Sequence, residues 1–564
     1  MERLRHIPDS WLMVPIVLLF FILAMDSARM DAPTMDEQNH LTRGLTLLKT
    51  GDPRFSLEHP PVVNVLSALP VYALTDVVIP TNLPNWQWER DGWYGVAESL
   101  LWEVNSNPDL LIFLARLPMI FLTILLALIG MRFAREFWRA AYGRWASLAA
   151  AFLLLFDPNI LAHGRFTTTD LGGAAFLLLA FWQLWRLWRL DGWQWKQLTV
   201  TTLAIGLAFG SKMSNLAIAP IFIVLALLPL YGSSFTIREG SRRLVQLAIA
   251  GIGGLFVVWM WYGFEWRQFC FLSDQLRALN SHSGPMPTFF AGIEQITFLS
   301  GGGRASYLLG EFSSEGFFWY FPIAFLVKTP LPVLVLIPIG LAYLIRRRLY
   351  RQRLLFLLLP CMYYALLSLN SALNIGYRHL IPLLPLLYVM LSGALAMWLT
   401  TALKHRHAYL RRGFAATILA TLLLTTLIIH PHYVSFFNKI AGGPREGWKV
   451  LIDSNIDWGQ DLKRLGLWLE TRQDRALHLS YFGSADPAAY QIDYEPLPGF
   501  PRHLDLWWNP PFEPQNPPPG LYAISVSNLG EPPLQTDEKV VFAYFRQREP
   551  DYRIGYSINI YEVR

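Results

Sequence analysis

Long apolar stretches alternate with short basic and longer polar segments along most of the chain. A helix that spans a bilayer needs ~20 mostly apolar residues. Stretches that qualify, some only with their flanks, lie near residues 11–27, 109–131, 145–161, 170–188, 198–212, 214–231, 244–264, 317–345, 354–370, 378–399 and 413–430. The pattern predicts a polytopic α-helical membrane protein whose chain crosses the bilayer about eleven times.

The basic residues between these stretches predict an orientation, because cytoplasmic loops carry an excess of Lys and Arg. With the N-terminus inside, alternation places five clusters on that side: 132–144, 186–196, 238–243, 346–353 and 404–412. The pair at 198–212 and 214–231 could be a re-entrant hairpin without changing this parity. The first stretch lacks a small-residue cleavage site, so we expect a retained anchor. The sequence thus predicts a multi-pass protein of the cytoplasmic (inner) membrane with its C-terminal segment outside.

Three larger polar segments then lie outside: 28–108, 265–316 and 431–564. The first favours interfacial amphipathic helices over strands. The last has a helical stretch near 460–471 and strand-like runs at 477–482, 521–527, 539–545 and 556–563, with a proline-rich loop at 509–519. We therefore expect two domains: a transmembrane domain of residues 1–430 and a small extracytoplasmic α+β cap of residues 431–564.

Composition agrees with this interpretation and excludes other classes. Hydrophobic residues make up 53% of the chain and charged residues 16%, against roughly 25% charged residues in a typical soluble domain. The net charge of +6 is spread over short clusters, which argues against a nucleic-acid partner. The two cysteines, Cys270 and Cys361, indicate no disulfide framework.

Several ionisable residues gather at the outer ends of the predicted spans, where a charge costs less than the ~2.5–3.5 kcal/mol expected at a helix centre. Asp36 and Glu37 follow the first span. A carboxylate there can act as a general base toward a hydroxyl, or complement a helix dipole. Asp170, at the outer start of the fourth span, could be a helix N-cap or a second acid.

Cationic residues interrupt otherwise apolar helices near a membrane face at Lys212, Lys328 and Arg378, the last followed by His379. A phosphate-bearing lipid substrate would supply the missing anions. Snorkelling of each side chain to the headgroups is the alternative.

Two patterns raise the question of a metal. Glu37 and His40, three residues apart, could hold a divalent ion together with Asp36. The segment 453–461 has the oxygen spacing of a calcium loop, but Trp458 stands where an EF-hand loop needs glycine. A helix start capped by Asp457 or Asp461, roofing the active site, is favoured over a calcium loop.

Short motifs carry a family resemblance along the whole membrane part. They are Asp36-Glu37, His59-Pro60-Pro61, Arg116-Leu117-Pro118, Tyr320-Phe321-Pro322 with Lys328-Thr329-Pro330, Gly376-Tyr377-Arg378-His379 with Pro382, and the segment from Asp453 to Asp461. In this order they resemble the lipid-carrier-dependent glycosyltransferases of the GT-C fold. The branch in question contains the protein O-mannosyltransferases and the bacterial aminoarabinose transferase of lipid A.

The resemblance implies an inverting transfer of a sugar from a polyprenyl-phosphate-linked donor to an acceptor hydroxyl, without an obligatory metal. Asp36 would be the general base and Glu37 would orient the acceptor. Arg116, aided by Lys328 and Arg378, would bind the donor phosphate. Two departures stand out: His59 replaces a lysine of the aminoarabinose transferase, and the 265–316 loop is too short for the β-trefoil of eukaryotic O-mannosyltransferases. Protein acceptors are therefore not implied.

The candidate site as a whole has a catalytic and a substrate-binding part. The catalytic candidates are Asp36, Glu37 and Asp170, and the substrate-binding candidates are His40, His59, Arg116, Lys212, Lys328, Arg378, His379, Asp453 and Asp457. A transporter or lipid flippase is the rival class, but such proteins usually have paired halves with broken helices meeting at mid-bilayer. A non-catalytic scaffold would leave the Asp36-Glu37 pair and Arg116 unexplained.

Overall fold

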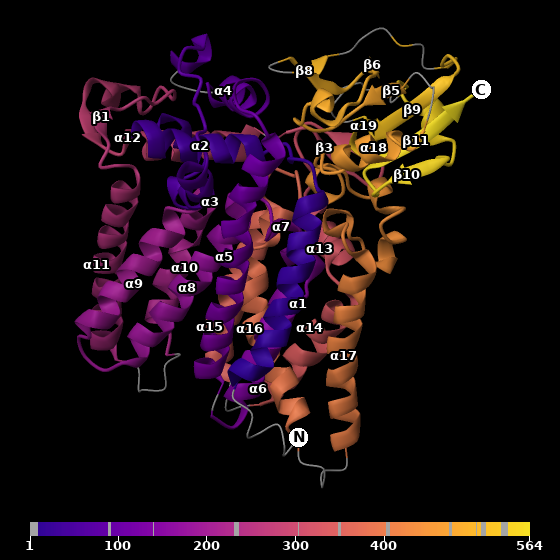
Figure 1. Ribbon diagram of the computed structural model, residues 1–564. Helices are drawn as coiled ribbons and strands as arrows, with labels where there is room; N and C mark the ends of the chain where they lie inside the picture. Colours follow the sequence, from indigo (N-terminus) through magenta and orange to yellow (C-terminus); the bar gives the residue numbers. More distant parts are fainter. Residues whose placement is uncertain are drawn as a thin grey trace.

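We describe the fold from a computed structural model, which covers the chain except residues 1–8, 88–91, 139, 230–235, 303, 348–350, 402–406, 473–476, 503–504, 509–511, 513–514 and 532–539. At one end of a bundle of helices lie the two polar segments 28–108 and 265–316, which we call the outer segments after their predicted side, and an α+β cap stands beside them (Figure 1). The helical bundle and the small sheet region near the C-terminus agree with the predicted fold class, and the division into two domains at residue 430 stays a prediction.

Each predicted apolar stretch contains at least one helix among its described residues. The bundle consists of α1 (Asp9–Met30), α5 (Pro108–Phe137), α6 (Ala140–Leu155), α8 (Thr169–Arg189), α9 (Trp195–Phe209), α10 (Ala219–Leu227), α11 (Ile237–Trp261), α13 (Tyr320–Lys328), α14 (Leu331–Arg346), α15 (Arg351–Leu369), α16 (Leu383–Leu399) and α17 (Ala408–Ile429), with the short α7 (Pro158–His163) between α6 and α8. Among the described residues, five helices are long and apolar enough to cross a membrane, or six if one bent pair is a single span. The chain is a multi-pass membrane protein, and the count of about eleven crossings stays a prediction.

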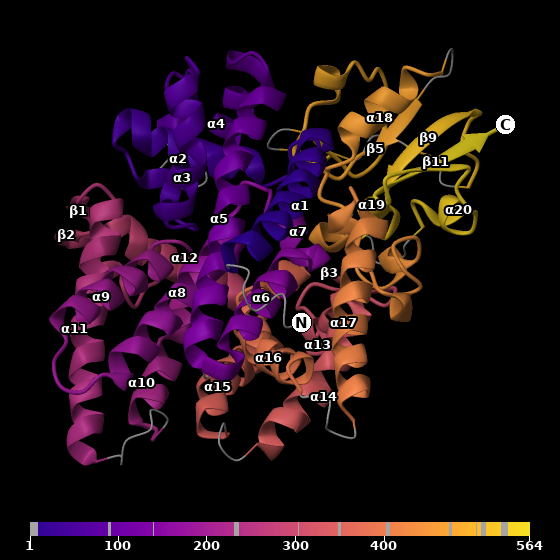
Figure 2. The ribbon, with the colours of Figure 1, turned by 60° about the horizontal axis from the view of Figure 1, so that its bottom comes forward.

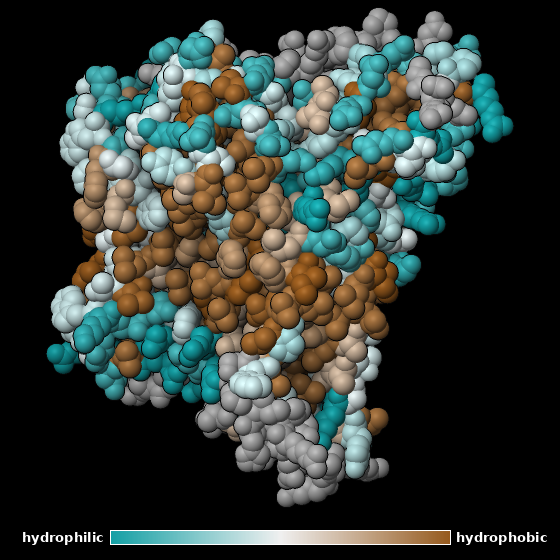
Figure 3. All heavy atoms as spheres, in the orientation of Figure 1, coloured by the Kyte–Doolittle hydropathy of each residue, from teal (hydrophilic) through white to brown (hydrophobic). Residues whose placement is uncertain are grey.

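Exposed apolar side chains form a broad band across the bundle, bounded by polar residues on both sides (Figure 3). The helix α16 lies inside the bundle, surrounded by α6, α14, α15 and α17 (Figure 2). Nearly all of its residues are buried. A helix that is apolar all round belongs in such a position.

The predicted span at 317–345 is not one straight helix. The helices α13 and α14 meet at 107°, because Pro330 lacks the N–H that would continue α13. The side-chain amide of Asn438 donates to the carbonyls of Leu326 at 2.7 Å and Thr329 at 2.8 Å. The backbone groups freed by the bend are thereby satisfied.

The first outer segment is helical, as expected. It contains α2 (Glu37–Thr50), α3 (Pro61–Leu74) and α4 (Trp93–Glu98). The helices α2 and α3 bury Leu41, Leu45 and Val71 against α5. A Cβ on Gly44 would come within 2.1 Å of the Asn64 carbonyl oxygen, so only glycine permits this approach of α2 to α3.

The second outer segment is mixed. It contains the antiparallel pair β1 (Trp266–Gln268) and β2 (Ser283–Pro285), then α12 (Pro287–Gly302), then the pair β3 (Ser306–Leu308) and β4 (Glu311–Ser313).

The cap is built on a five-stranded sheet of order β10-β11-β9-β5-β6. Its strands are β5 (Leu477–Ser480), β6 (Glu495–Pro496), β9 (Gly520–Ser525), β10 (Tyr552–Ile554) and β11 (Ile558–Val563), with α18 (Leu462–Leu469), α19 (Val526–Leu529) and the hairpin β7 (Phe500–Arg502) and β8 (Asp505–Trp508) beside them. The predicted strand at 539–545 is wrong for its described part, which contains α20 (Ala543–Arg546); residue 539 lies outside the described residues. Phe542 and Phe545 enter a core with Tyr522 and Tyr561, and this packing outweighs local strand preference.

A buried ionic cluster joins the cap to the bundle. Asp31, just after α1, accepts from Arg165 at 2.6 Å and from Arg464 of α18 at 2.7 Å. Two backbone hydrogen bonds follow, from Ala32 N–H to the Gln460 carbonyl and from Met35 N–H to the Trp458 carbonyl. The segment that ends at Asp36 is thereby fixed against the cap.

Candidate active site

A cavity of about 470 Å³ lies where the outer segments meet the bundle. The loop before α2, the start of α8, the segment after α9, the end of α12 and the turn before α16 all contribute to its walls. The cavity brings together seven of the predicted site residues: Asp36, His40, His59, Asp170, Lys212, Arg378 and His379. Apolar side chains of α12 and α15, such as Leu299 and Leu367, line another part of the wall.

Four charged residues form a chain along the polar wall. Arg378 Nη1 lies 2.7 Å from Asp36 Oδ2 and 3.7 Å from Asp170 Oδ2. Asp170 also pairs with Lys212. Negatively and positively charged side chains therefore alternate along this wall, so that the buried charges compensate one another.

The three carboxylates in the lining differ in access. The Asp36 side chain is 32% exposed, whereas that of Glu58 is 11% exposed and pairs with Arg43, and that of Asp170 is 5% exposed and pairs with two cations. Asp36 is thus the carboxylate that a molecule in the cavity can reach. Burial acts to raise the pKa of Asp36, but the charges and hydrogen bond around it, of which the Arg378 charge contributes most, together hold this pKa below its ordinary value.

Two histidines flank the acids as neutral rings. Burial, aided by nearby Arg43, lowers the pKa of His40 to about 4. Burial and the neighbouring His40 lower the pKa of His59 well below its ordinary value. His40 Nδ1 shares a hydrogen bond with Asn64 at 2.9 Å, and His59 Nδ1 shares one with Thr169 at 3.2 Å. The residue that replaces the family lysine is therefore a hydrogen-bonding group and not a cation.

Several nitrogen atoms of cavity-lining residues are unpaired among the described residues. Nε of Arg378 and Nε2 of His379 are buried and have no hydrogen-bond partner in the described part of the chain. Arg304 lines the same cavity and forms no ion pair with any described residue. The Arg378 guanidinium lies 4.4 Å from the centre of the Trp458 ring, which fixes its plane.

The structure places Arg116 and Glu37 outside this cavity. Arg116 is 1% exposed, and its guanidinium donates to both Glu37 oxygens at 2.9 and 2.5 Å. It also donates to the carbonyls of Ala28, Asp31 and Ala32. All five N–H donors of an arginine are thereby used. This arrangement favours a structural role for Arg116 over donor-phosphate binding, and a structural role for Glu37 over orienting the acceptor. Both sequence-based assignments stay predictions.

Lys328 also lies away from the cavity lining. Its ammonium donates to the carbonyls of Val434 at 2.8 Å and Asn455 at 2.5 Å and lies 4.6 Å from the Phe437 ring centre. Its contacts hold the segment after α17 against α13, so the predicted role in neutralising the leaving phosphate receives no support from this geometry.

The segment 453–461 supports the cavity from the cap side. Asn455 accepts from Tyr377 N–H at 2.9 Å, and Ser454 donates to the Ile375 carbonyl at 2.6 Å. These bonds position the turn that carries Arg378, in agreement with the predicted roof. Asp461 occupies the N-cap position of α18 but forms no side-chain capping bond.

The two other acids of this segment do not line the cavity. Burial raises the pKa of Asp453 to about 6 and the pKa of Asp457 to about 8. Asp457 accepts from the backbone of Gly459 and Ser527, both at 3.3 Å. Substrate binding by either residue stays a prediction.

No group of three or more His, Cys, Asp or Glu residues among the described residues is arranged to hold a metal ion. The predicted grouping of Asp36, Glu37 and His40 fails geometrically, because Glu37 points to Arg116.

Among the cavity residues of the outer segments that sequence reasoning missed, two are cationic, Arg43 and Arg304. Arg43 is three residues after His40 on α2, so helical spacing from His40 could have identified it. Arg304 stands in a loop with no periodic signal.

These features define a class: a multi-pass membrane protein with a cavity at one end of its helix bundle that offers one accessible carboxylate beside several cations. Residues 111–261, from α5 to the end of α11, match a family model described as dolichyl-phosphate-mannose-protein mannosyltransferase. Over this part of the chain the match confirms the resemblance that the motifs indicate. No curated protein matches the chain.

Solved structures with an overall likeness share little sequence. ArnT from Cupriavidus metallidurans, bound to undecaprenyl phosphate, is 13% identical with a TM-score of 0.47, and the match covers 98% of each chain. The oligosaccharyltransferase AglB from Archaeoglobus fulgidus, with an inhibitory peptide and a dolichol-phosphate, is 13% identical with a TM-score of 0.42; the match covers 88% of this chain and 59% of that one. Arabinosyltransferase EmbB from Mycobacterium smegmatis is 14% identical with a TM-score of 0.34, over 70% and 31% of the chains.

Proposed function

We propose that this protein is an inverting glycosyltransferase that moves a sugar from a polyprenyl-phosphate-linked donor to an acceptor hydroxyl. The observation that carries the proposal is the pairing of the accessible Asp36 carboxylate with Arg378 in one cavity. A hydroxyl acceptor needs a base, and a lipid-phosphate leaving group needs cations. The description of the matched family names dolichyl-phosphate-mannose, which is a sugar donor of this class.

In this account, the donor phosphate binds to the cationic wall. Arg378 offers an Nε–H, and Arg304 offers an unpaired guanidinium. Guanidinium groups bind phosphate oxygens in bidentate fashion. Neutral His59 and His379 add hydrogen bonds, and the apolar wall near Leu299 and Leu367 accepts the first isoprene units.

Donor binding also prepares the base. Arg378 lowers the pKa of Asp36, which weakens Asp36 as a base in the free protein. A bound phosphate shares the Arg378 charge, so the pKa of Asp36 rises toward its ordinary value. The carboxylate then takes the acceptor proton as the acceptor oxygen attacks the anomeric carbon, and the C–O bond to the phosphate breaks. The lipid phosphate leaves with the bonding electron pair.

We further propose that the cavity faces the outer side of the cytoplasmic membrane, with the N-terminus inside. The basic clusters between the helices support this orientation. A transporter remains the second candidate class, but nothing in the comparisons favours it, and the charged residues gather at one end of the bundle instead of its middle.

The experiment that tests the function uses purified protein and a panel of labelled polyprenyl-phosphate sugars. The donor from which free lipid phosphate is released identifies the sugar. The anomeric configuration of the product, compared with that of the donor, tests whether the transfer is a single displacement. Retention of configuration would require a covalent intermediate and would contradict this mechanism.

A further inference from the structure

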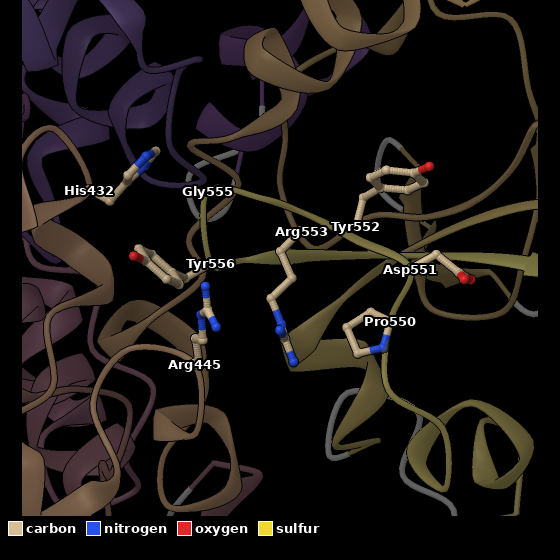
Figure 4. A pocket seen from close by; sticks show the side chains of 8 residues that line it. All are labelled: His432, Arg445, Pro550, Asp551, Tyr552, Arg553, Gly555 and Tyr556. Atoms are coloured by element: carbon tan, nitrogen blue, oxygen red, sulfur yellow. The ribbon is translucent and has the colours of Figure 1, made fainter.

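A second cavity, of about 400 Å³, lies within residues 431–564, between the segment that follows α17 and β10 (Figure 4). One side is formed by His432 and Arg445, which follow α17. The other side is formed by Tyr552, Arg553 and Tyr556, in and after β10. Its lining shares no residue with that of the Asp36–Arg378 cavity.

Two guanidinium groups extend into this cavity from separate segments. In Figure 4, Arg445 and Arg553 point toward the same space beside Tyr556. Arg445 forms no ion pair and no side-chain hydrogen bond with any described residue. Arg553 pairs with Glu549 at 3.0 Å, but the Glu549 side chain is 82% exposed, so this pair is weak. Like charges that share a cavity repel each other, and an anion between them would remove the repulsion.

The other polar groups of the cavity are compatible with an anion. The one carboxylate in the lining, Asp551, already accepts the Glu562 N–H at 2.8 Å. Burial lowers the pKa of His432, so its ring is neutral near pH 7. Nδ1 of His432 lies 3.8 Å from Asp461 Oδ1, a carboxylate that Arg464 already pairs at 2.6 Å.

The position of the cavity indicates what kind of anion it meets. His432 follows shortly after α17, whose last turns expose Leu424, Leu427 and Ile428 at 54%, 40% and 81%. The helix α17 runs below β10 in Figure 1, and the apolar band of Figure 3 ends beneath the cap. Tyrosine rings such as those of Tyr552 and Tyr556 suit the headgroup level of a bilayer. The cavity therefore lies at the headgroup level, directly above an apolar helix face.

We propose that this cavity binds the phosphate group of a phospholipid of the adjacent leaflet, with the acyl chains along the exposed face of α17. Arg445 and Arg553 bind the phosphate oxygens, since the arginine fork matches phosphate geometry. The bound lipid fastens the cap to the membrane surface. This site does not depend on the proposed glycosyl transfer.

The test measures binding of dihexanoyl phosphatidylglycerol, a short-chain lipid, to the purified full chain in detergent by calorimetry. Arg445→Gln and Arg553→Gln should each weaken binding about tenfold, as expected for loss of a hydrogen bond to a charged group. The double variant should show no measurable binding. Arg445→Lys should bind between wild type and Arg445→Gln, because lysine keeps the charge but loses the fork. Arg548→Gln, an exposed change of equal charge in the same domain, is the matched control and should bind like wild type.

Three outcomes would overturn the proposal. The first is unchanged binding in the double variant while its thermal unfolding matches wild type. The second is an equal loss in Arg548→Gln, which would indicate a general charge effect. The third is displacement of the lipid by inorganic phosphate at an equal concentration, which would indicate a site for a free anion instead of a lipid.

Discussion

Asp36 Oδ2 and Arg378 Nη1 lie 2.7 Å apart, although 342 positions separate the two residues in the chain. One residue begins the first outer segment, and the other stands in the turn before α16. Their contact joins the base that the reaction needs to the cation that its leaving group needs. The proposed chemistry depends on this single pair.

Asp36→Asn should lower the rate of sugar transfer by a factor of about 10²–10⁴, as expected for loss of a general base. The substitution keeps the size of the side chain, so the melting temperature should stay close to that of wild type. Asp52→Asn provides the control, since Asp52 pairs locally with Arg54 and does not line the cavity. Turnover that persists in Asp36→Asn would move the base elsewhere, with Asp170 as the next candidate.

The acid limb of kcat/KM should report the pKa of Asp36 in the free protein. Arg378 holds this pKa below its ordinary value of 3.8, so activity is fully present above that pH and falls as pH decreases through the lowered pKa. Arg378→Gln removes the largest of the causes that lower this pKa and should shift the acid limb to higher pH. If the acid limb of this variant is unshifted, Arg378 does not set the pKa of the group that controls the limb, and the proposed coupling of Asp36 to Arg378 is contradicted.

Arg116→Lys should reduce stability more than it reduces donor use. The buried pair with Glu37 is broken, and losing one partner of a buried pair costs about 3–5 kcal/mol; a lysine recovers only part of this. Thermal unfolding in detergent and donor KM should be measured together. Arg29→Lys, on the exposed surface of α1, is the control. A normal melting temperature with a raised donor KM would restore the donor-phosphate assignment of Arg116.

Asn516→Cys should react with a membrane-impermeant maleimide in intact cells, because Asn516 is exposed and the cap is expected outside. Both cysteine variants are made in a Cys270→Ser parent protein, since Cys270 is partly accessible in an outer segment and could itself react. Arg347→Cys, at the opposite end of the bundle after α14, should react only after lysis. The reverse pattern would invert the topology.

The helical membrane fold was predictable because each stretch carries its own apolar signal. The bend between α13 and α14 was partly predictable, because the sequence contains Pro330. The hydrogen bonds that satisfy the bend come from Asn438, which is far along the chain. The cap strand predicted at 539–545 failed where aromatic packing around Phe545 decided the structure.

The candidate site was predictable where a motif residue also lines the cavity, as with Asp36, Asp170, Lys212 and Arg378. Arg116 shows the limit of such reasoning. A motif identifies an arginine at the outer end of α5, but only tertiary contacts show that Glu37 and three carbonyls use its donors. Arg304 lies in a loop without periodicity, so its place in the cavity could not be anticipated.

The most direct measurement follows a doubly labelled polyprenyl-phosphate sugar, with separate labels on lipid and sugar, in vesicles that contain the purified protein and an acceptor extract. The account predicts that the two labels separate, with free lipid phosphate appearing as the sugar enters the acceptor fraction. Asp36→Asn should keep the labels together. Movement of both labels across the bilayer on an intact donor, at the same rate in wild type and Asp36→Asn, would contradict the account and identify a transporter.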